Sequence, residues 1–460
     1  MAQLSYDLLV IGAGAAGSAA AHSAAEQGAH VALIERDKIG GTCLNYGCDP
    51  TKTLLHTARL LSQARQSETY GVLIPLSSLE WRAAREHVHQ VVNQMRGGTS
   101  DEASAQLKKQ GIDFMYGEAR FTSPREISVD GRSLTAERVI VAAGSQNLVP
   151  QIEGLKEVGF LTNKTVLNLQ KLPNRLAIVG GGAIGIEFSQ MFQRFGVEVS
   201  VIEKGPMILD KEDPALATQL CTLLSQEGIE FRTSAELLRV RQTAPGRQLT
   251  YRDGQGREQE LTADEILLSL GRRPALEGLG LEEIGVKTSK RGIEVDHYLR
   301  TSVPHIWAAG DITGGYMFTH VANEQGRLAA QNAFAAQPRP FDEPVIPWVT
   351  FTDPPLAHAG PTEDELRQRG QNYQVGRAEF KDVERALTLG QTQGEIKLLA
   401  DAQGKLLAGH ILGPGAGELI APIVIAIRTR MSAGELAATL LPYPTLSEGL
   451  RWAAERLHNS

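Results

Sequence analysis

"LLVIGAGAAG", residues 8–17, decides how this chain folds, because the same pattern returns as "LAIVGGGAIG" at residues 176–185. In both copies an apolar strand runs into a G-x-G-x-x-G turn and then into a small-residue helix. The glycines of the two turns correspond one to one with a shift of 168 residues, as Gly12, Gly14 and Gly17 and then Gly180, Gly182 and Gly185.

An acidic residue follows each glycine pattern at the end of a second apolar strand. Glu35 and Glu203 each stand 18 residues past the last glycine of their copy. This arrangement is typical of dinucleotide binding, because the glycines let the backbone approach a pyrophosphate, the helix N-terminus offers N–H groups, and the acid binds a ribose. Two ordinary strand–helix–strand units are the alternative. The repeat predicts an α/β fold with two Rossmann-like domains and two dinucleotides.

Three other strands fit this plan. "RVIVAAGS" and "EILLSLGRRP" are β-rich runs that reach Gly144 and Gly271, and they could close the two nucleotide-binding sheets. "VPHIWAAGDITGG" ends its strand at Gly310 and Asp311. An acid in this position could bind a sugar-like chain of hydroxyls, or it could cap a helix.

The rest of the chain divides by composition. Residues 53–110 have the pattern of amphipathic helices, and we expect them to be an insertion packed on the first domain. After a Pro-rich stretch at 335–344, strands such as "GEIKLLAD" and helices such as "GELIAPIVIAIRT" predict an α+β unit without a nucleotide motif.

Composition narrows the range of functions. The net charge is −7 with a pI near 5.9, and no Lys/Arg-rich run is present, which argues against a nucleic-acid partner. The first residues lack a signal-peptide pattern and their apolar run is too short to span a bilayer, so we expect no membrane association and a cytoplasmic protein. Three cysteines in 460 residues do not make a disulfide scaffold.

Two of these cysteines, Cys43 and Cys48, lie in "GGTCLNYGCDPTK" at residues 40–52. Two cysteines without a nearby histidine or third cysteine are too few for structural zinc. A regular helix would hold their Cα atoms roughly 8–9 Å apart, whereas a disulfide needs less than about 7 Å. A bond therefore requires a bend, which Gly47 permits. Such a pair is typical of a reversible redox centre, and a helix beginning here would favour a Cys48 thiolate. Two unpaired thiols are the alternative.

The motifs together resemble the flavoprotein disulfide reductase family, which includes dihydrolipoyl dehydrogenase, glutathione reductase and mercuric reductase. The resemblance runs nearly end to end through "GAGAAG…E", "GGTCLNYGCDPTK", "GGGAIGIE", "AAGDITGG" and "YPTLSEGL". It implies bound FAD, NAD(P)H as reductant and a homodimer whose subunits share active sites. The implied domains are FAD-binding at 1–150 and 271–340, NAD(P)-binding at 151–270, and dimerisation at 345–460.

The resemblance also implies a role for each matching residue. Hydride would pass from nicotinamide to flavin and electrons then to the Cys43–Cys48 disulfide, with Cys48 nearer the flavin in a charge-transfer contact and Cys43 meeting the substrate. Lys52 would lie beside the flavin and pair with Glu187. The implied FAD-binding residues are Gly12, Gly14, Gly17, Glu35, Thr42, Lys52, Gly144, Gly310 and Asp311. The implied NAD(P)H-binding residues are Gly180, Gly182, Gly185, Glu203 and Gly271.

The chain departs from the dehydrogenases near its C-terminal end. They carry a proton-shuttling histidine before Pro-Thr and a glutamate five residues later, whereas here Tyr443 precedes Pro444 and only Glu448 matches. A phenol has a pKa of about 10 against about 6.5 for imidazole, so it is a poor proton shuttle near pH 7. Mercuric reductases carry Tyr at this place. We therefore expect a mercuric reductase-like enzyme, with a soft metal ion bound transiently at Cys43 and Cys48 and no permanent metal site.

Several alternatives stay open. Tyr443 could simply pack between its two prolines. We expect neither the N-terminal Cys-x-x-Cys domain nor the C-terminal cysteine pair of mercuric reductases, so the acceptor could be mercury, another metal, a disulfide or a quinone. A dihydrolipoyl dehydrogenase-like reductase and a flavin-bound redox sensor without turnover are the rival functions. Glu203 favours NADH over NADPH, because an acid repels a 2′-phosphate, and the neighbouring Lys204 offsets this only in part.

Overall fold

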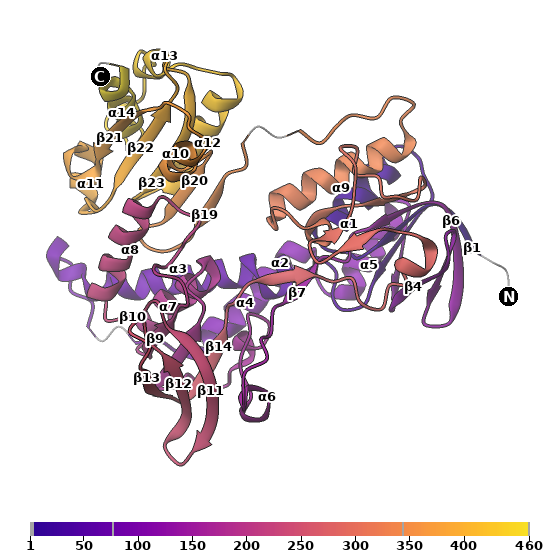
Figure 1. Ribbon diagram of the computed structural model, residues 1–460, viewed down its shortest axis with the longest axis horizontal. Helices are drawn as coiled ribbons and strands as arrows, with labels where there is room; N and C mark the ends of the chain where they lie inside the picture. Colours follow the sequence, from indigo (N-terminus) through magenta and orange to yellow (C-terminus); the bar gives the residue numbers. More distant parts are fainter. Residues whose placement is uncertain (1–3, 76–77, 343–344, 459–460) are drawn as a thin grey trace. The chain divides into compact units, whose positions relative to one another are not determined.

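The computed structural model describes residues 4–75, 78–342 and 345–458 (Figure 1). Each of its two compact units is assembled from three separate segments of chain. Unit 1 comprises Met1–Thr53, Arg82–Leu148 and Gly271–Asp342, and unit 2 comprises Leu54–Trp81, Val149–Leu270 and Glu343–Ser460. The four domain boundaries expected from the sequence stay a prediction.

The predicted helical stretch after residue 53 contains three α-helices. They are α3 (Cys48–Arg65), α4 (Trp81–Arg96) and α5 (Ser100–Lys109). The sequence predicted that this stretch is an insertion on the first domain, but its first part, Leu54–Trp81, belongs to unit 2. Helix α3 therefore begins in unit 1 and ends in unit 2. Amphipathicity shows that a helix has a buried face, but not which neighbour covers it.

Unit 1 is built on a seven-stranded sheet in the order β3-β2-β1-β6-β5-β4, with β18 also paired to β6. The pairs β3–β2, β2–β1, β1–β6 and β18–β6 are parallel. The strands of this parallel part are β1 (Leu4–Ile11), β2 (Val31–Glu35), β3 (Ile112–Tyr116), β6 (Arg132–Val141) and β18 (Ile306–Ala308). Strands β4 (Ala119–Ser123) and β5 (Glu126–Val129) extend it as antiparallel neighbours.

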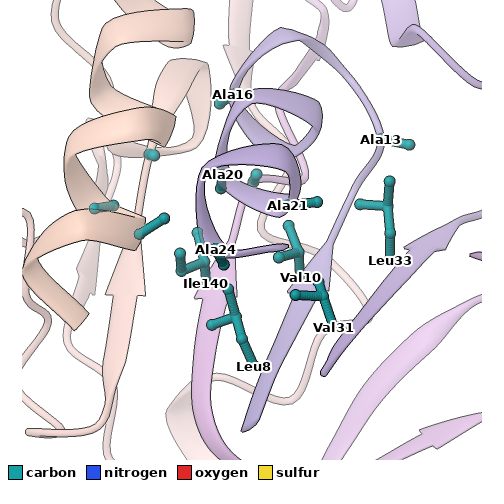
Figure 2. Close-up of a cluster of buried hydrophobic side chains, with 14 of the residues drawn as sticks. Leu8, Val10, Ala13, Ala16, Ala20, Ala21, Ala24, Val31, Leu33 and Ile140 are labelled. Atoms are coloured by element: carbon teal, nitrogen blue, oxygen red, sulfur yellow. The ribbon is translucent and has the colours of Figure 1, made fainter. Parts of the chain in front are cut away.

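Helix α1 (Ala15–Ala25) covers one face of this sheet with alanines, and α9 (Thr319–Phe334) packs beside it. Figure 2 shows the alanine side chains of α1 against branched side chains of β1, β2 and β6. Small side chains let the two helices approach closely: a Cβ on Gly326 of α9 would lie 2.0 Å from the backbone oxygen of Ala16. This packing fixes the position of Thr319, the first residue of α9.

Unit 2 contains a second, four-stranded parallel sheet in the order β10-β9-β8-β14. Its strands are β8 (Arg175–Val179), β9 (Glu198–Ile202), β10 (Glu230–Arg232) and β14 (Glu265–Leu268). The sequence repeat reappears in the register of pairing. Ile11 faces Ile34 in the first sheet, and Val179 faces Ile202 in the second, again with a shift of 168 residues.

The C-terminal part of unit 2 is a five-stranded antiparallel sheet in the order β19-β20-β23-β22-β21. Its strands are β19 (Trp348–Thr350), β20 (Leu356–Ala359), β21 (Gln374–Glu379), β22 (Glu395–Ala400) and β23 (Leu406–Leu412). Helices α12 (Ala416–Arg428) and α14 (Glu448–His458) pack on it. Two Rossmann-like sheets and this α+β unit make the mixed α/β fold that the sequence predicts.

This C-terminal sheet buries a charged group where the pattern predicts apolar packing. Lys397 on β22 is 2% exposed, and its ammonium contacts the carboxylates of Asp213 and Glu363. Asp213 also caps α8 (Pro214–Gln226), because its Oδ1 accepts hydrogen bonds from Ala215 N at 3.2 Å and Leu216 N at 3.4 Å. A lysine so buried needs such partners, and here they join α8 to the sheet.

Three further buried side chains adjoin this group. His358 of β20 stacks on the Trp348 ring, with centroids 3.6 Å apart, and its cross-strand neighbour His410 meets it edge-on at 4.6 Å. Glu212 accepts a hydrogen bond from Trp348 Nε1 at 2.7 Å. Burial lowers the pKa of each histidine to about 4 and raises the pKa of Glu212 to about 7. The histidines are therefore neutral at pH 7.

Across the described ranges, no helix is long and apolar enough to cross a membrane.

Candidate active site

The two glycine turns have the same local geometry. Gly12 and Gly180, which directly follow β1 and β8, have φ angles of +103° and +111°, values that residues with a side chain rarely adopt. A Cβ on Gly17 would lie 1.7 Å from the backbone oxygen of Gly12, and one on Gly185 would lie 2.1 Å from that of Gly180. Each helix therefore packs directly against the turn that precedes it, as nucleotide binding requires.

The two acids hold their turns in equivalent ways. Glu35 accepts a hydrogen bond from Ala13 N at 2.8 Å through Oε2 and one from Asp37 N at 2.8 Å through Oε1. Glu203 accepts from Gly181 N at 2.6 Å and from Gly205 N. Each carboxylate thus fixes the glycine turn beside the place where a ribose would bind.

The helix ends behind these turns suit a pyrophosphate. Helix α1 and helix α7 (Ala183–Arg194) begin after Gly14 and Gly182, and neither end has a side-chain cap. A Cβ on Gly182 would meet nothing within 4 Å, and one on Gly14 would meet only Gly41 Cα at 3.9 Å. Uncapped N–H groups facing open space can bind an anion. The residues present therefore fit two dinucleotides.

Asp311 is held by a short relay that the sequence did not indicate. It lies on a 3₁₀ turn, Gly310–Thr313, and accepts a hydrogen bond from Ser145 Oγ. The guanidinium of Arg272 donates to Ser145 Oγ at 2.7 Å, to the Ser145 backbone oxygen at 2.8 Å and to Asn147 Oδ1 at 3.0 Å. Burial lowers the pKa of Arg272, while the charges of Asp311 and Cys48 oppose this.

Gly144 and Gly271 lie at the ends of the pair that carries this relay. Strand β7 (Ser145–Asn147) runs antiparallel to β15 (Arg272–Pro274), so Gly144 directly precedes the first strand and Gly271 the second. The structure places Gly271 in unit 1 with Gly144, and not with the glycine turn of α7. Its expected contact with NAD(P)H stays a prediction.

The cysteines stand on either side of a helix break. Cys43 lies on α2 (Gly41–Tyr46), one residue after Thr42, and Cys48 is the first residue of α3. Gly47 separates the helices, and a Cβ there would lie 3.1 Å from the Thr42 backbone oxygen and 3.3 Å from Cys43 Cα. The bend that the spacing argument requires is therefore present at Gly47. Both side chains are free thiols in this structure.

The pKa values of the two thiols are shifted in opposite directions. The pKa of Cys48 is lowered, first by the hydrogen bond from Cys43 and then by the Thr319 hydroxyl and the Lys52 charge, although burial and Asp49 oppose this. The pKa of Cys43 is raised, because this thiol donates to Cys48 and is itself buried. Cys48 also begins a helix, whose N-terminus favours a thiolate. The reduced pair therefore carries its charge on Cys48.

The remaining predicted residues lie in different places. Glu187 is 4% exposed on α7, and its Oε1 accepts a hydrogen bond from Phe351 N at 2.9 Å. Lys52 lies on α3 in unit 1 and Glu187 in unit 2, so their pairing stays a prediction. Tyr443 is 72% exposed, and Glu448 begins α14 and accepts a hydrogen bond from Thr445 N at 3.2 Å.

Comparison with known protein families shows which family has this arrangement of motifs. Residues 6–326 match the family described as pyridine nucleotide-disulphide oxidoreductase, and residues 346–454 match its dimerisation domain. The chain belongs to this family. Family membership implies FAD and NAD(P)H, and the C-terminal unit is a dimerisation domain that supports a homodimer. Bound FAD would supply the two-electron chemistry that links NAD(P)H to the cysteine pair.

Relatives with different activities are similar to this chain. A dihydrolipoyl dehydrogenase of Thermus scotoductus is 39% identical over 98% of this chain and 97% of its own length. A mercuric reductase of Staphylococcus aureus is 35% identical over 98% of this chain and 82% of its own. Among solved structures, the Cu(II) complex of the HOCl-induced flavoprotein disulfide reductase RclA from Escherichia coli matches with a TM-score of 0.86 and 29% identity, over 96% of this chain and 98% of that one.

Two neighbours of the cysteine pair, Thr319 and Arg272, were not predicted. Thr319 begins α9, and its Oγ1 lies 3.6 Å from Cys48 Sγ. Arg272 belongs to "GRRP", where its charge follows a buried strand. A charged residue shortly after a buried strand, or a hydroxyl residue at a helix start, was the available signal, but such residues are common.

Proposed function

We propose that this family member oxidises NADH and reduces a thiophilic metal ion at Cys43 and Cys48, in the manner of a mercuric reductase. The observation that carries the proposal is Tyr443, which stands where the dehydrogenases have their proton-shuttling histidine. Resolution of a mixed disulfide needs a proton donor at each turnover, and a phenol supplies one poorly near pH 7. A metal ion needs only thiolate ligands.

The reaction balances without a proton donor at Tyr443. One NADH reduces one Hg(II) to Hg(0), or two Cu(II) to two Cu(I), and releases NAD⁺ and one proton. Cys48 holds a negative charge beside Lys52 and at the start of α3, so the first thiolate ligand is ready near neutral pH. Cys43 keeps its proton in the free pair and loses it when a metal ion binds, since coordination requires the thiolate.

Two relatives support this acceptor class. One is a mercuric reductase that covers nearly this whole chain, and the other, RclA, is known as a Cu(II) complex. Hg(II) and Cu(II) are therefore the two ions to test first. The dihydrolipoyl dehydrogenase of Thermus scotoductus, at 39% identity, favours a second candidate function, the reduction of a small disulfide such as lipoamide.

We also propose that NADH is preferred to NADPH. Glu203 directly follows β9, and both of its carboxylate oxygens accept hydrogen bonds from backbone N–H groups, so its charge is fixed beside the ribose position. The charge of the neighbouring Lys204 offsets this only in part, because its Nζ also lies 2.7 Å from Glu236 Oε1. A Glu203→Gln variant should raise kcat/KM for NADPH about tenfold relative to NADH. An unmodified enzyme that uses both nucleotides equally would exclude this role for Glu203.

The dimerisation domain carries Tyr443 and Glu448, and we propose that these residues complete the active site of the partner subunit. Exposure of the Tyr443 ring supports this, because an exposed ring in the segment that precedes α14 is available to another subunit. The cytoplasmic location expected from the sequence stays a prediction.

The proposed function can be tested with purified, FAD-loaded enzyme. NADH oxidation should be faster with Cu(II) or Hg(II) than with lipoamide or glutathione disulfide. Tyr443→His should raise the lipoamide rate about 10²-fold, because it restores an acid–base group. Tyr443→Phe tests whether the phenol binds metal, and Tyr116→Phe, which changes another exposed tyrosine, is the matched control. A fast lipoamide reaction in the unmodified enzyme would refute the argument from Tyr443, and no turnover with any acceptor would favour a redox sensor.

A further inference from the structure

A hydroxyl reaches the Cys48 sulfur from a segment that is distant in the sequence. Thr319 Oγ1 lies 3.6 Å from Cys48 Sγ, although 271 residues separate the two positions. A sulfur atom is larger than oxygen, so this separation suits a hydrogen bond to a thiol or thiolate. The contact joins α9 to the first turn of α3 within unit 1.

The position of Thr319 is set by several contacts rather than by its own side chain. Gln325, on the same helix, accepts a hydrogen bond from Gly310 N at 2.8 Å through its Oε1. Further along α9, Gly326 packs directly against the Ala16 backbone of α1. The rings of Phe318 and His320 stack on either side of Thr319 in sequence, with centroids 5.6 Å apart. The hydroxyl is therefore held at Cys48 by the packing of the whole helix.

We propose that Thr319 is a further catalytic residue, whose hydroxyl donates a hydrogen bond to the Cys48 thiolate and keeps the charge of the reduced pair on Cys48. Reduction of a Cys43–Cys48 disulfide takes two electrons from NADH through the flavin and one proton, leaving one thiol and one thiolate. Thr319 keeps its own proton and only shares it. This role concerns the redox pair itself and holds for any acceptor.

Other groups also act on Cys48 and must be separated from Thr319. Cys43 of α2 donates to Cys48, Lys52 of α3 stabilises the thiolate and Asp49 of α3 destabilises it. The charge of Arg272 on β15 also interacts with Cys48. The Thr319 hydroxyl lowers the pKa of Cys43 as well, but there the hydrogen bond to Cys48 dominates and raises it. Thr319 thus differs from Lys52, Asp49 and Arg272 because it acts through an uncharged hydroxyl, and from Cys43 because it is not part of the redox pair.

The test measures the titration of Cys48 by its rate of alkylation. Holoenzyme carrying Cys43→Ser leaves Cys48 as the one reactive thiol of the motif, and iodoacetamide modification at this residue is followed by mass spectrometry between pH 5 and 10. Thr319→Val in this background should move the midpoint upward by about one pH unit, because a hydrogen bond to a charged group is lost. At a pH below both midpoints, alkylation should be about tenfold slower. Thr319→Ser should restore the parent midpoint.

Two further variants keep the result interpretable. Thr319→Ala should give the same upward shift as Thr319→Val, so a folding defect in one variant does not end the test. Thr53→Val is the matched control, because its hydroxyl donates to the Asp49 backbone oxygen of α3 at 2.8 Å, and its midpoint should not move. A midpoint in Thr319→Val equal to the parent's, or equal shifts in the Ser and Val variants, would overturn the proposal.

Discussion

Replacing Lys397 by methionine should strongly destabilise the C-terminal unit. The Lys397 side chain is 2% exposed, and its ammonium contacts Asp213, itself 1% exposed, and Glu363. Removing one member of a buried ion pair costs about 3–5 kcal/mol, because the partner charges stay buried without compensation. Asp213 keeps its two capping N–H groups, so we take the lower end, about 3 kcal/mol. In a unit of this size, that is a fall of about 6–12 °C in Tm.

The loss should also depend on pH in a defined direction. In the unmodified protein burial raises the pKa of Asp213, but Lys397 outweighs it and the net shift is downward. Such a carboxylate adds stability above its unfolded pKa, and this stability is lost only as pH falls through the lower, folded value. Without Lys397 the same burial raises the pKa, so the variant should regain stability as acid protonates Asp213. The Tm difference from the unmodified protein should therefore be smaller at pH 5 than at pH 7.5.

Thermal unfolding followed by circular dichroism at these two pH values measures both effects. Lys405→Met is the matched control, since the Lys405 side chain is 40% exposed and its ammonium lies 3.5 Å from Glu435, where an ion pair contributes little. If Lys397→Met lowers Tm no more than Lys405→Met does, the pair is not stabilising. A difference that does not narrow on acidification would show that Asp213 is not the group left unpaired.

Two more outcomes are expected. Reduction by NADH should produce a long-wavelength absorption band that Cys48→Ser abolishes and Cys43→Ser retains; the opposite pattern would exchange the roles of the two thiols. Because burial lowers the pKa values of His358 and His410 to about 4, below the unperturbed value of about 6.5, both histidines add stability above pH 6.5 that is lost as pH falls towards 4. The pKa of Glu212 is raised to about 7, so this residue has the opposite effect, but it takes up one proton where the two histidines take up two. Guanidinium unfolding should therefore show a net fall in the free energy of unfolding between pH 6.5 and 4.5. His358→Gln should make this dependence on pH less steep.

Local patterns allowed much of the fold to be predicted. The glycine turns, their acids and the helix break at Gly47 all follow from spacing over a few residues, because sterics and backbone hydrogen bonds act at that range. The repeat added more, since the register of one sheet reproduces that of the other.

Contacts between distant segments could not be predicted. Nothing in the sequence around Thr319 indicates that its hydroxyl reaches Cys48, because the contact depends on how α9 packs on α1. Lys397 and His410 occupy inward positions on strands, where alternation predicts apolar residues, and only their tertiary partners explain them. The placement of residues 54–81 in unit 2 could not be predicted either, because it also depends on contacts with distant segments.

The interrupted course of unit 1 has a consequence for synthesis on the ribosome. Strand β6 ends at Val141, but β18, which pairs with its C-terminal half, begins at Ile306. At about 5–20 residues per second, the intervening chain takes about 10–30 s to translate. During this time the whole segment Val149–Leu270 leaves the ribosome, while one edge of the apolar C-terminal end of β6 stays unpaired. The nascent chain is therefore most exposed to aggregation at this early strand, and the hydrogen bond between Ser145 and Asp311 cannot form until Asp311 has left the ribosome.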